Sequence, residues 1–570
     1  MAITVSAPST RAVAEFRCAA SPPLLRAPAI FATRSRAPLA IRKDAASPMP
    51  LTDTARERAD NLIRRLKNAR VGGSFWGGRP ELAKGCTVWE PRRGDAAAFC
   101  PAAGNPIFLW VDEDPAVGAS GHLPGLLTGE LDPWHLLDQV AQVVAPADDA
   151  LAIIARLLGI PVIDSVTGKP LAHDLRARRS LAWQVLEAPT YREPFTGSEI
   201  PPEAAIDLLG EWRRHLDTVG GIGVQFGMRG WKRSQIDRFL TGVSGVPRHA
   251  RTTRAALEVA GTKQAAVAIW PSRVPLEFEA RAAASGVPVA RVEDGFLRSP
   301  GLGVHLVPPQ SIIVDREGIH YDPARPSDLE RLLAEHRFPP ELLCRAVALR
   351  MTIVSAGLGK YGSGGKPPAI VLPPDRRSIL VIGQVADDRS VLMGDVAGGG
   401  NAGLLERARA HAPDAFLLYK PHPDVLSGHR RAGLRRETHH LADHILNRPC
   451  GLAPLLKVVD EVHVLTSLAG FEALLRGCDV MCHGAPFYAG WGLTHDLVSV
   501  PRRKRRLTLD QLVAGALLLY PLYLDPDTGL PCSAERLVAR LAGATPRPSL
   551  VNRLRLFEGL IRRALRPATA

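Results

Sequence analysis

The stretch LLKVVDEVHVLTSLAGFEALLRGCDVM, residues 455–481, decides the fold class of this 570-residue chain. Its apolar run EVHVLT (461–466) predicts a strand, the turn TSLAG follows, and an apolar helical segment then leads to a second strand that begins near residue 479. A strand, a crossover helix and another strand in this order form a parallel βαβ unit. The segment therefore predicts an α/β fold with largely parallel sheets.

The same alternation of apolar runs and helices extends back to about residue 250. Further strands are predicted at 265–270, 287–292, 311–315, 377–383 and 415–420. Stretches 326–336 and 401–411 have helical character, and the Gly- and Pro-rich segment GKYGSGGKPP (359–368) divides the region. We therefore expect two Rossmann-like lobes with a cleft between them.

An internal repeat links the two halves of the chain. YREPFTG, a Tyr followed by an acid, Pro and Thr-Gly, recurs as YLDPDTG in front of a second helix. The matching pairs are 191–209 with 523–541, 136–163 with 455–481, and 176–181 with 503–508. The amino-terminal copy lacks the polar motifs of 384–424 and has no counterpart of FYAGWGLT, so we expect it to keep the fold and to serve a structural or docking role.

These patterns predict a division of the chain. The expected parts are 1–48 as a disordered segment or an over-extended start, 60–214 as a degenerate half-module, 215–370 and 371–545 as two Rossmann-like lobes, and 549–566 as a basic amphipathic helix. Met49 is an alternative start.

Composition and charge limit the function classes. The chain has 46% hydrophobic and 22% charged residues, as in globular proteins, and its net charge of +14 suits an anionic partner. Its eight cysteines are scattered without a CxxC pair, which favours a reducing compartment and predicts no metal cluster. Since no run of about 18 apolar residues and no secretion signal is found, we expect a cytoplasmic protein.

The aromatic loop CHGAPFYAGWGLTHD (482–496) contains too many glycines for a helix or a central strand. Its aromatic side chains either pack on the core or line a ligand site. Because the repeat copy lacks this segment, we favour Tyr488 and Trp491 as walls of a ligand site.

Two motifs predict an anion site at strand ends. YKPHPDV (419–425) places Lys420 at the end of a strand and holds His422 between two prolines, either as a phosphate donor or as a turn histidine. In the turn after 461–466, Thr466 or Ser467 can cap a helix whose free N–H groups attract anions, and Glu472 one turn later could accept ribose hydroxyls.

Two further motifs place carboxylates at strand ends. LVIGQVADDRSV (380–391) supplies Gln384, Asp387 and Asp388, as a base, as a nucleophile or as a solvated turn. RVEDGFLRSPGLG (291–303) supplies Glu293, Asp294 and Arg298, which could hold a polyhydroxyl ligand or form an ion pair that fixes the loop.

These motifs, in this order, resemble a known family. EDGFLRSPGLG, VDREGIHYDPARPSDLE, GQVADDRSV, YKPHPDV, TSLAGFEALLRG and GAPFYAGWGLTHD followed by PRR are similar to the bacterial capsule polysaccharide biosynthesis proteins of the KpsC/LipA type, the retaining β-Kdo transferases. The resemblance covers about residues 215–545. It implies that 60–214 is a degenerate glycosyltransferase half-module, 215–370 the acceptor-side lobe and 371–545 the CMP-sugar-binding lobe. It implies a GT-B-like fold, CMP-Kdo as donor, and transfer of 3-deoxy-D-manno-oct-2-ulosonic acid (Kdo), with retained configuration, to a Kdo linker on lyso-phosphatidylglycerol.

The resemblance also implies roles for residues. It places Asp388 of the QxxxDxS pattern beside the anomeric carbon, with Gln384 nearby and Asp387 as an open alternative. The implied donor contacts are Lys420, His422, Thr466, Ser467, Gly470, Glu472, Tyr488 and Trp491, and the expected acceptor contacts are Glu293, Asp294 and Arg298. No cofactor or metal is expected. Full-length relatives carry two active modules, and this chain departs from them because its first copy lacks these motifs.

Other functions stay open. One is a non-catalytic capsule assembly or export factor that binds a nucleotide or a glycan, and another is a transferase for a different CMP-activated acid such as sialic acid. A nucleic-acid binder is disfavoured because PRRKRR (501–506) has no interleaved aromatics.

The carboxyl-terminal segment SLVNRLRLFEGLIRRALR (549–566) combines an apolar stripe with arginines. It predicts a helix that lies on the inner face of the cytoplasmic membrane, reinforced by 501–506, or else one that packs back on the first lobe. Other capsule assembly and export proteins are possible partners.

Overall fold

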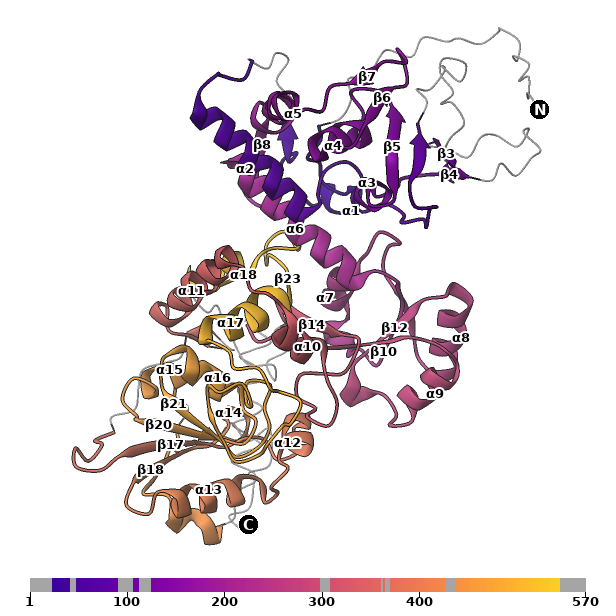
Figure 1. Ribbon diagram of the computed structural model, residues 1–570. Coiled ribbons are helices and arrows are strands. Elements are labelled where there is room, and N and C mark those ends of the chain that lie inside the picture. Colours follow the sequence, from indigo (N-terminus) through magenta and orange to yellow (C-terminus); the bar gives the residue numbers. More distant parts are fainter. Residues whose placement is uncertain are drawn as a thin grey trace. The chain divides into compact units, whose positions relative to one another are not determined.

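The computed structural model describes residues 23–41, 48–90, 106–111, 125–297, 308–359, 362–363, 370–426, 436–448 and 450–543. The chain forms two compact units, Met1–Arg213 and Arg214–Ala570. Each is described by itself (Figure 1). The predicted helix at 549–566 and Arg298 lie outside the described residues. No helix in the described ranges is both long and apolar enough to cross a bilayer.

The amino-terminal unit is built on a six-stranded sheet of order β4-β3-β2-β5-β6-β7. In this order its strands are Leu126–Thr128, Ile107–Val111, Cys86–Trp89, Val140–Ala145, Val162–Asp164 and Pro170–Leu171. All neighbours pair in parallel except β6 and β7. The helices of this unit are α2 (Asp53–Ala69), α3 (Pro133–Leu137), α4 (Ala150–Leu158), α5 (Leu175–Ala182) and α6 (Pro202–Val219), which continues past the unit boundary.

Residues 23–41 are part of this unit, so the prediction of a disordered segment over 1–48 is wrong for them. Strand β1 (Ala40–Ile41) pairs with β8 (Thr190–Arg192). Helix α1 (Ala29–Ala32) buries Phe31 against Trp212, with ring centroids 5.0 Å apart. The composition is rich in Ala, Arg, Pro and Ser, but its few large apolar residues anchor the segment.

The first lobe of the second unit contains a mixed sheet of order β11-β10-β12-β13-β14-β23. In this order its strands are Arg248–Ala250, Ile222–Phe226, Ala266–Ile269, Val289–Asp294, Ser311–Asp315 and Leu522–Tyr523. The first four are parallel, and β14 and β23 each pair antiparallel. Apolar side chains of α7 (Gly230–Leu240) cover one face, and those of α8 (Thr253–Lys263) and α9 (Phe278–Ala284) cover the other.

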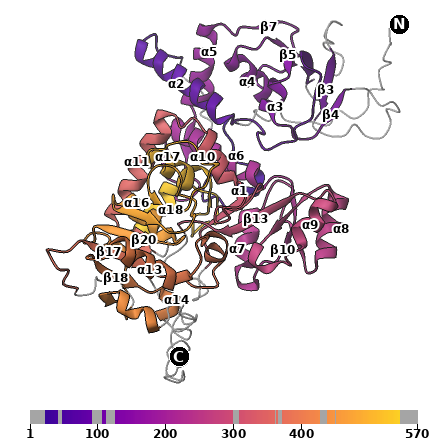
Figure 2. The same cartoon turned by 60° about the horizontal axis from the view of Figure 1, so that its bottom comes forward.

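The second lobe contains a parallel sheet of order β19-β18-β17-β20-β21-β22. Its strands are His444–Ile445, Phe416–Lys420, Ser378–Ile382, Glu461–Val464, Asp479–Cys482 and His495–Asp496. Helix α13 (Gly400–His411) buries Leu404, Leu405 and Ala408 on one face, and α16 (Leu468–Leu475) lies on the other (Figures 1 and 2). Both predicted lobes are therefore present, and each predicted strand matches an observed one.

Several shorter elements complete the second unit. They are α10 (Asp328–Glu335), α11 (Pro340–Ser355), β15 (Leu358–Gly359), β16 (Gly362–Ser363), α12 (Arg389–Gly394), α14 (Pro423–Leu426), α15 (Leu452–Leu455), α17 (Leu509–Val513) and α18 (Ala534–Gly543). Because β23 follows α17 in the chain, residues of the predicted second lobe return to the sheet of the first.

The internal repeat is visible in the structure. In each copy a π-helical turn precedes the Tyr motif, at Trp183–Glu187 and at Ala514–Leu519. The Tyr191 hydroxyl lies 3.5 Å from the carbonyl oxygen of Val185, and the Tyr523 hydroxyl lies 2.7 Å from that of Leu517. The sheet of the amino-terminal unit also has the strand order of the second lobe, strand for strand.

Candidate functional site

Three strand ends of the second lobe meet at one edge of its sheet. Strand β17 lies between β18 and β20 and runs parallel to both. The residues that follow or end these strands, Gln384, Lys420 and Thr466, therefore lie at the same carboxyl edge, where open α/β sheets bind ligands.

Gln384 holds two of these strand ends together. Its side-chain oxygen accepts from the Thr466 backbone N–H at 2.8 Å, and its amide nitrogen donates to the Thr466 hydroxyl at 3.1 Å. Its backbone exchanges two hydrogen bonds with the Asn401 side chain at 2.9 and 2.7 Å. Gln384 is buried, and its amide is engaged in holding Thr466 in this structure; its catalytic role stays a prediction. Thr466 acts as its partner.

Lys420 and Glu472 form the charged part of this edge. Lys420 is buried, which lowers the pKa of its ammonium group. The Glu472 carboxylate and the Cys450 thiol are near enough to oppose this shift. Glu472 also lies against the backbone of Gly359, where an added Cβ would come within 2.5 Å of its Oε2. A buried cation at a strand end is suited to hold an anion.

His422 is fixed by its own turn. Its Nδ1 accepts a hydrogen bond from the backbone N–H of Asp424 at 3.1 Å. When the neutral ring accepts at Nδ1, its proton resides on Nε2. This contact is the one expected of a turn histidine, and it leaves the Nε2 proton of the neutral ring as a donor; the phosphate contact stays a prediction.

Ser467 begins helix α16, as predicted. Its hydroxyl accepts from the backbone N–H of Ala469 at 3.2 Å, which is the geometry of an N-cap. The positive end of the helix dipole thus lies beside Thr466 at the same edge.

The aromatic loop is packed rather than open, which corrects the prediction for three residues. Tyr488 and Trp491 are both 0% exposed. The Tyr488 hydroxyl donates to the Ser467 carbonyl at 2.5 Å, and the Trp491 indole donates to the Phe487 carbonyl at 2.9 Å. Gly470 lies against the Tyr488 ring, where a Cβ would collide with its hydroxyl. These residues support the turn of Ser467 and do not form a ligand wall in this structure.

Asp388 is exposed at the start of α12. Its Oδ1 accepts from the backbone N–H and the hydroxyl of Ser390, at 3.1 and 3.3 Å, so Asp388 is the N-cap of this helix. The neighbouring Asp387 is exposed as well. The carboxylates are therefore accessible, as a nucleophile requires.

Of the predicted acceptor residues, Glu293 and Asp294 end strand β13. Asp294 forms an ion pair with Lys232 at 2.8 Å, and the Lys232 ammonium group lies 4.0 Å from the centre of the Trp270 ring. The Glu293 carboxylate accepts from the backbone N–H of Asp294 at 3.1 Å. Asp294 is thus held by an ion pair, but its partner is Lys232 of α7, which the sequence did not indicate.

Charged residues of both lobes affect the pKa of Tyr321. This residue follows β14 of the first lobe and is buried. Burial is the main cause that raises the pKa of its hydroxyl, and the Glu293 carboxylate is the second. The Arg389 guanidinium lowers this pKa and the Asp388 carboxylate raises it. Charges at the end of β13 and at the start of α12 therefore both act on the same tyrosine, which the sequence did not indicate.

Aromatic stacking joins two of the motifs across the lobes. The Phe296 ring, which follows β13, lies 4.5 Å from the Phe487 ring at an interplanar angle of 18°. The EDGF and FYAGWG motifs are thus parts of one packed structure.

Three arginines of the basic run 501–506, at positions 502, 503 and 505, make internal contacts, whereas Lys504 and Arg506 are exposed, so the role of the run at the membrane stays a prediction. Arg502 pairs with Glu330 at 2.8 Å. Arg503 is buried and bonds to Glu330 and to two carbonyls of the aromatic loop. Arg505 donates to the carbonyl of His336 at 2.8 Å. Arg502 and Arg503 follow Pro501 in one of the motifs that carry the family resemblance. Their positive charge nevertheless led to the expectation that they lie on the protein surface.

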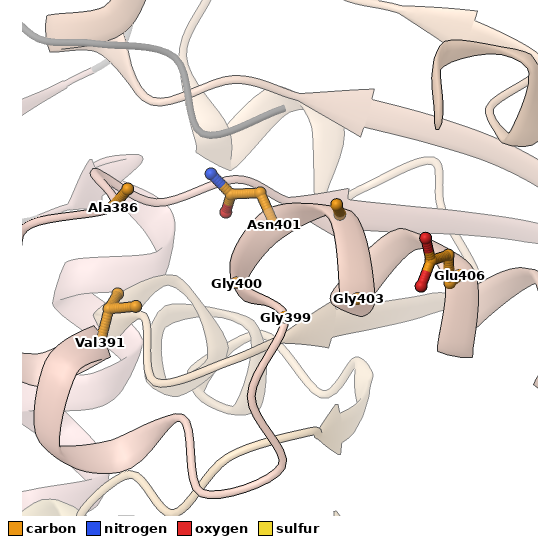
Figure 3. A pocket seen from close by; sticks show the side chains of 8 residues that line it. Ala386, Val391, Gly399, Gly400, Asn401, Gly403 and Glu406 are labelled. Carbon is orange, nitrogen blue, oxygen red and sulfur yellow. The ribbon is translucent and has the colours of Figure 1, made fainter. Parts of the chain in front are cut away.

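A pocket lies beside the Asp388 turn (Figure 3). It has a volume of about 400 Å³ and is formed by Ala386 and Val391 on one side and by the first turns of α13 on the other. Its other lining residues are Gly399, Gly400, Asn401, Ala402, Gly403 and Glu406. The lining side chains are small or apolar except for Asn401 and Glu406.

Two Rossmann-like lobes with polar strand ends directed to a common region define a GT-B-like α/β protein. A sequence profile of the capsule polysaccharide biosynthesis protein family matches residues 265–354 and 368–524. The lipopolysaccharide-processing protein LpsZ of Rhizobium meliloti is 39% identical over 353 residues, which cover 61% of this chain and 80% of LpsZ. The chain belongs to this capsule polysaccharide biosynthesis family.

Two further proteins of this kind are similar to the chain. The capsule polysaccharide modification protein LipA of Neisseria meningitidis serogroup B is 37% identical over 368 residues, 63% of this chain and 51% of LipA. The solved structure of the β-Kdo 2,4 transferase of Thermosulfurimonas dismutans KpsC is 33% identical with a TM-score of 0.50, and the match covers 57% of this chain and 98% of that chain. The chain spans about half the length of LipA.

Proposed function

We propose that this protein is a capsule polysaccharide glycosyltransferase that moves Kdo from CMP-Kdo to a lipid-linked Kdo acceptor with retention of configuration. The observation that carries the proposal is the exposed Asp388 carboxylate, which caps α12 at the turn whose residues Ala386 and Val391 line the pocket of Figure 3. Family membership and the 33% identity to a Kdo transferase domain support the choice of sugar.

Retention follows from two inversions at one carbon. In the first, an Asp388 oxygen bonds to the anomeric carbon as the bond from that carbon to the phosphate oxygen of CMP breaks. In the second, the acceptor hydroxyl oxygen bonds to the same carbon, the bond to Asp388 breaks, and the hydroxyl proton passes to a base. Glu293, which lies on the first lobe, is our candidate for that base or for an acceptor contact.

When the bond to the sugar breaks, negative charge develops on the phosphate of CMP, which we propose lies at the carboxyl edge of the second lobe. His422 can donate through Nε2, the start of α16 offers backbone N–H groups, and Lys420 supplies a buried cation. A phosphate beside Lys420 would raise the ammonium pKa back towards its usual range, because it favours the charged form. Glu472 is placed to accept ribose hydroxyls. These groups form the proposed donor site, and none of the steps requires a metal.

The acceptor and the location are part of the proposal. A Kdo linker on lyso-phosphatidylglycerol is met at the inner face of the cytoplasmic membrane, so we expect peripheral association there. Flotation with phosphatidylglycerol liposomes tests this, using the whole chain and a chain that ends at Pro546. Salt-sensitive binding that is lost on truncation supports association through 549–566, and equal binding by both proteins opposes it.

The function is tested by incubating the purified protein with CMP-Kdo and lyso-phosphatidylglycerol that carries one Kdo. A product heavier by one Kdo residue, with β configuration by NMR, is expected. CMP-sialic acid in place of CMP-Kdo tests the other sugar acid. Binding of CMP without transfer of either sugar would instead indicate the non-catalytic assembly factor.

A further inference from the structure

Three potential metal ligands meet in the second lobe, away from the proposed donor site. They are His411 at the end of α13, and Glu461 and His463 on strand β20. One ligand atom from each lies within 4.8 Å of the other two. Glu461 begins β20, whereas Thr466 follows its end, so the cluster lies towards the opposite end of the sheet from Lys420.

Two members of this cluster, Glu461 and His463, are buried, and each has a side-chain polar atom without a well-formed hydrogen bond. Glu461 is 2% exposed and His463 is 0% exposed. The His463 Nε2 lies 3.3 Å from the Glu461 Oε1 without the geometry of a hydrogen bond, and no other partner is found for it among the described residues. The second oxygen of Glu461 lies 3.1 Å from the half-exposed Arg377. A buried imidazole nitrogen and a buried carboxylate that face each other in this way gain stability from a shared cation.

A second layer orients the buried histidine. The Nδ1 of His463 lies 3.2 Å from the Nε2 of His483, which is also 0% exposed. This contact occupies one ring nitrogen and turns the other towards Glu461, as in the outer shell of metal-binding histidines. With a metal on Nε2, the His463 proton resides on Nδ1 and is donated to His483. Arg407 then loses its long bond of 3.3 Å to His483 and keeps the one of 2.9 Å to the Gly398 carbonyl.

We propose that His411, Glu461 and His463 bind one transition-metal ion of the zinc class. Two imidazoles and one carboxylate form a known zinc ligand set, with water in the fourth position. Tetrahedral zinc places its ligand atoms about 3.3 Å apart, so a small rotation of the exposed His411 side chain closes the site. The ion would join the end of α13 to β20 and stabilise the lobe. This structural role is independent of the transfer reaction.

The test uses the full untagged chain after treatment with a chelator. Titration calorimetry with Zn²⁺ should give one site per chain, and saturating Zn²⁺ should raise the Tm. His411→Ala is the test variant, because this side chain is exposed and its loss spares the core. Its matched control is His440→Ala, an exposed histidine outside the cluster. Glu461→Gln keeps the volume of the buried ligand and removes its charge.

We expect His440→Ala to bind Zn²⁺ like the wild type, and His411→Ala and Glu461→Gln to bind at least about 30-fold more weakly, without the rise in Tm. A visible spectrum of tetrahedral Co²⁺ should appear in the wild type and in His440→Ala only. The proposal is overturned if the wild type binds no Zn²⁺, or if His411→Ala binds it with unchanged affinity.

Discussion

Arg503 and Glu330 form a buried ion pair, with 3.1 Å between Nε and Oε2 and side-chain exposures of 3% and 8%. The same guanidinium donates to the carbonyls of Pro486 and Ala489 at 2.6 and 2.8 Å. One side chain therefore ties the aromatic loop of the second lobe to helix α10 of the first. The burial of Arg503 lowers its pKa, and Glu330 opposes this shift.

We expect Arg503→Ala to destabilise the protein, because it leaves two carbonyls without their donor and leaves the buried Glu330 carboxylate with Arg502 as its remaining partner. Removal of one partner of a buried pair typically costs about 3–5 kcal/mol. Lys504→Ala, at an exposed neighbouring position, is the control. Urea denaturation of both variants measures the difference. Equal midpoints would show that Arg503 does not hold the loop.

Gly470→Ala tests the packing of the aromatic loop. The added Cβ would collide with the Tyr488 hydroxyl, so we expect a loss of about 1–3 kcal/mol, typical of overpacking. Gly261→Ala is the control, since no atom lies within 4 Å of its added Cβ. The control should be as stable as the wild type or more stable, because Ala favours helix. If Gly470→Ala behaves like Gly261→Ala, the Tyr488 packing is not as described.

Much of the fold could be predicted because it rests on local patterns. The strands follow from apolar runs, and the cap at Ser467 follows from the turn before α16. The structure of segment 23–41 could not be predicted, because its composition resembles that of a disordered chain. A few apolar side chains, such as that of Phe31, are nevertheless buried and hold it in place.

Side-chain directions at the site were less predictable. Periodicity does not show that the Gln384 amide faces Thr466 or that Tyr488 points into the core. The contacts of Phe296 with Phe487 and of Arg503 with Glu330 join residues far apart in the sequence. Such contacts depend on the arrangement of whole lobes, which no local pattern contains.

The repeat supplies a matched pair of helix caps. Ser467 caps α16, and Asp149 caps the corresponding α4 through a 2.6 Å hydrogen bond from Leu151. We expect Ser467→Ala and Asp149→Ala each to cost about 1 kcal/mol of stability. Only Ser467→Ala should raise the KM for CMP-Kdo, by about fivefold or more, because only α16 begins at the proposed donor site. A similar rise in KM for Asp149→Ala would contradict the structural role of the amino-terminal unit.

His215 predicts a dependence of stability on pH. Burial lowers its pKa to about 3 from an ordinary value of 6.5, and its Nε2 lies 2.8 Å from the Phe239 carbonyl. Below pH 6.5 the unfolded chain binds a proton that the folded protein does not, so stability falls as the pH falls. The loss at pH 5 is about 2 kcal/mol for this residue.

The variant His215→Gln keeps an N–H donor and removes this titration. We expect its stability relative to the wild type to improve by about 2 kcal/mol between pH 7 and pH 5, as measured by urea denaturation. A constant difference across this range would show that His215 is protonated equally in both states.

The central claim is that the Asp388 carboxylate attacks the sugar, and Asp388→Asn tests it most directly. Asn is as good an N-cap as Asp, so helix α12 should be retained. We predict that kcat for Kdo transfer falls by several orders of magnitude while CMP affinity stays nearly unchanged. The adjacent Asp387→Asn should keep near wild-type turnover. Wild-type turnover in Asp388→Asn, or loss of turnover in Asp387→Asn alone, would contradict the account.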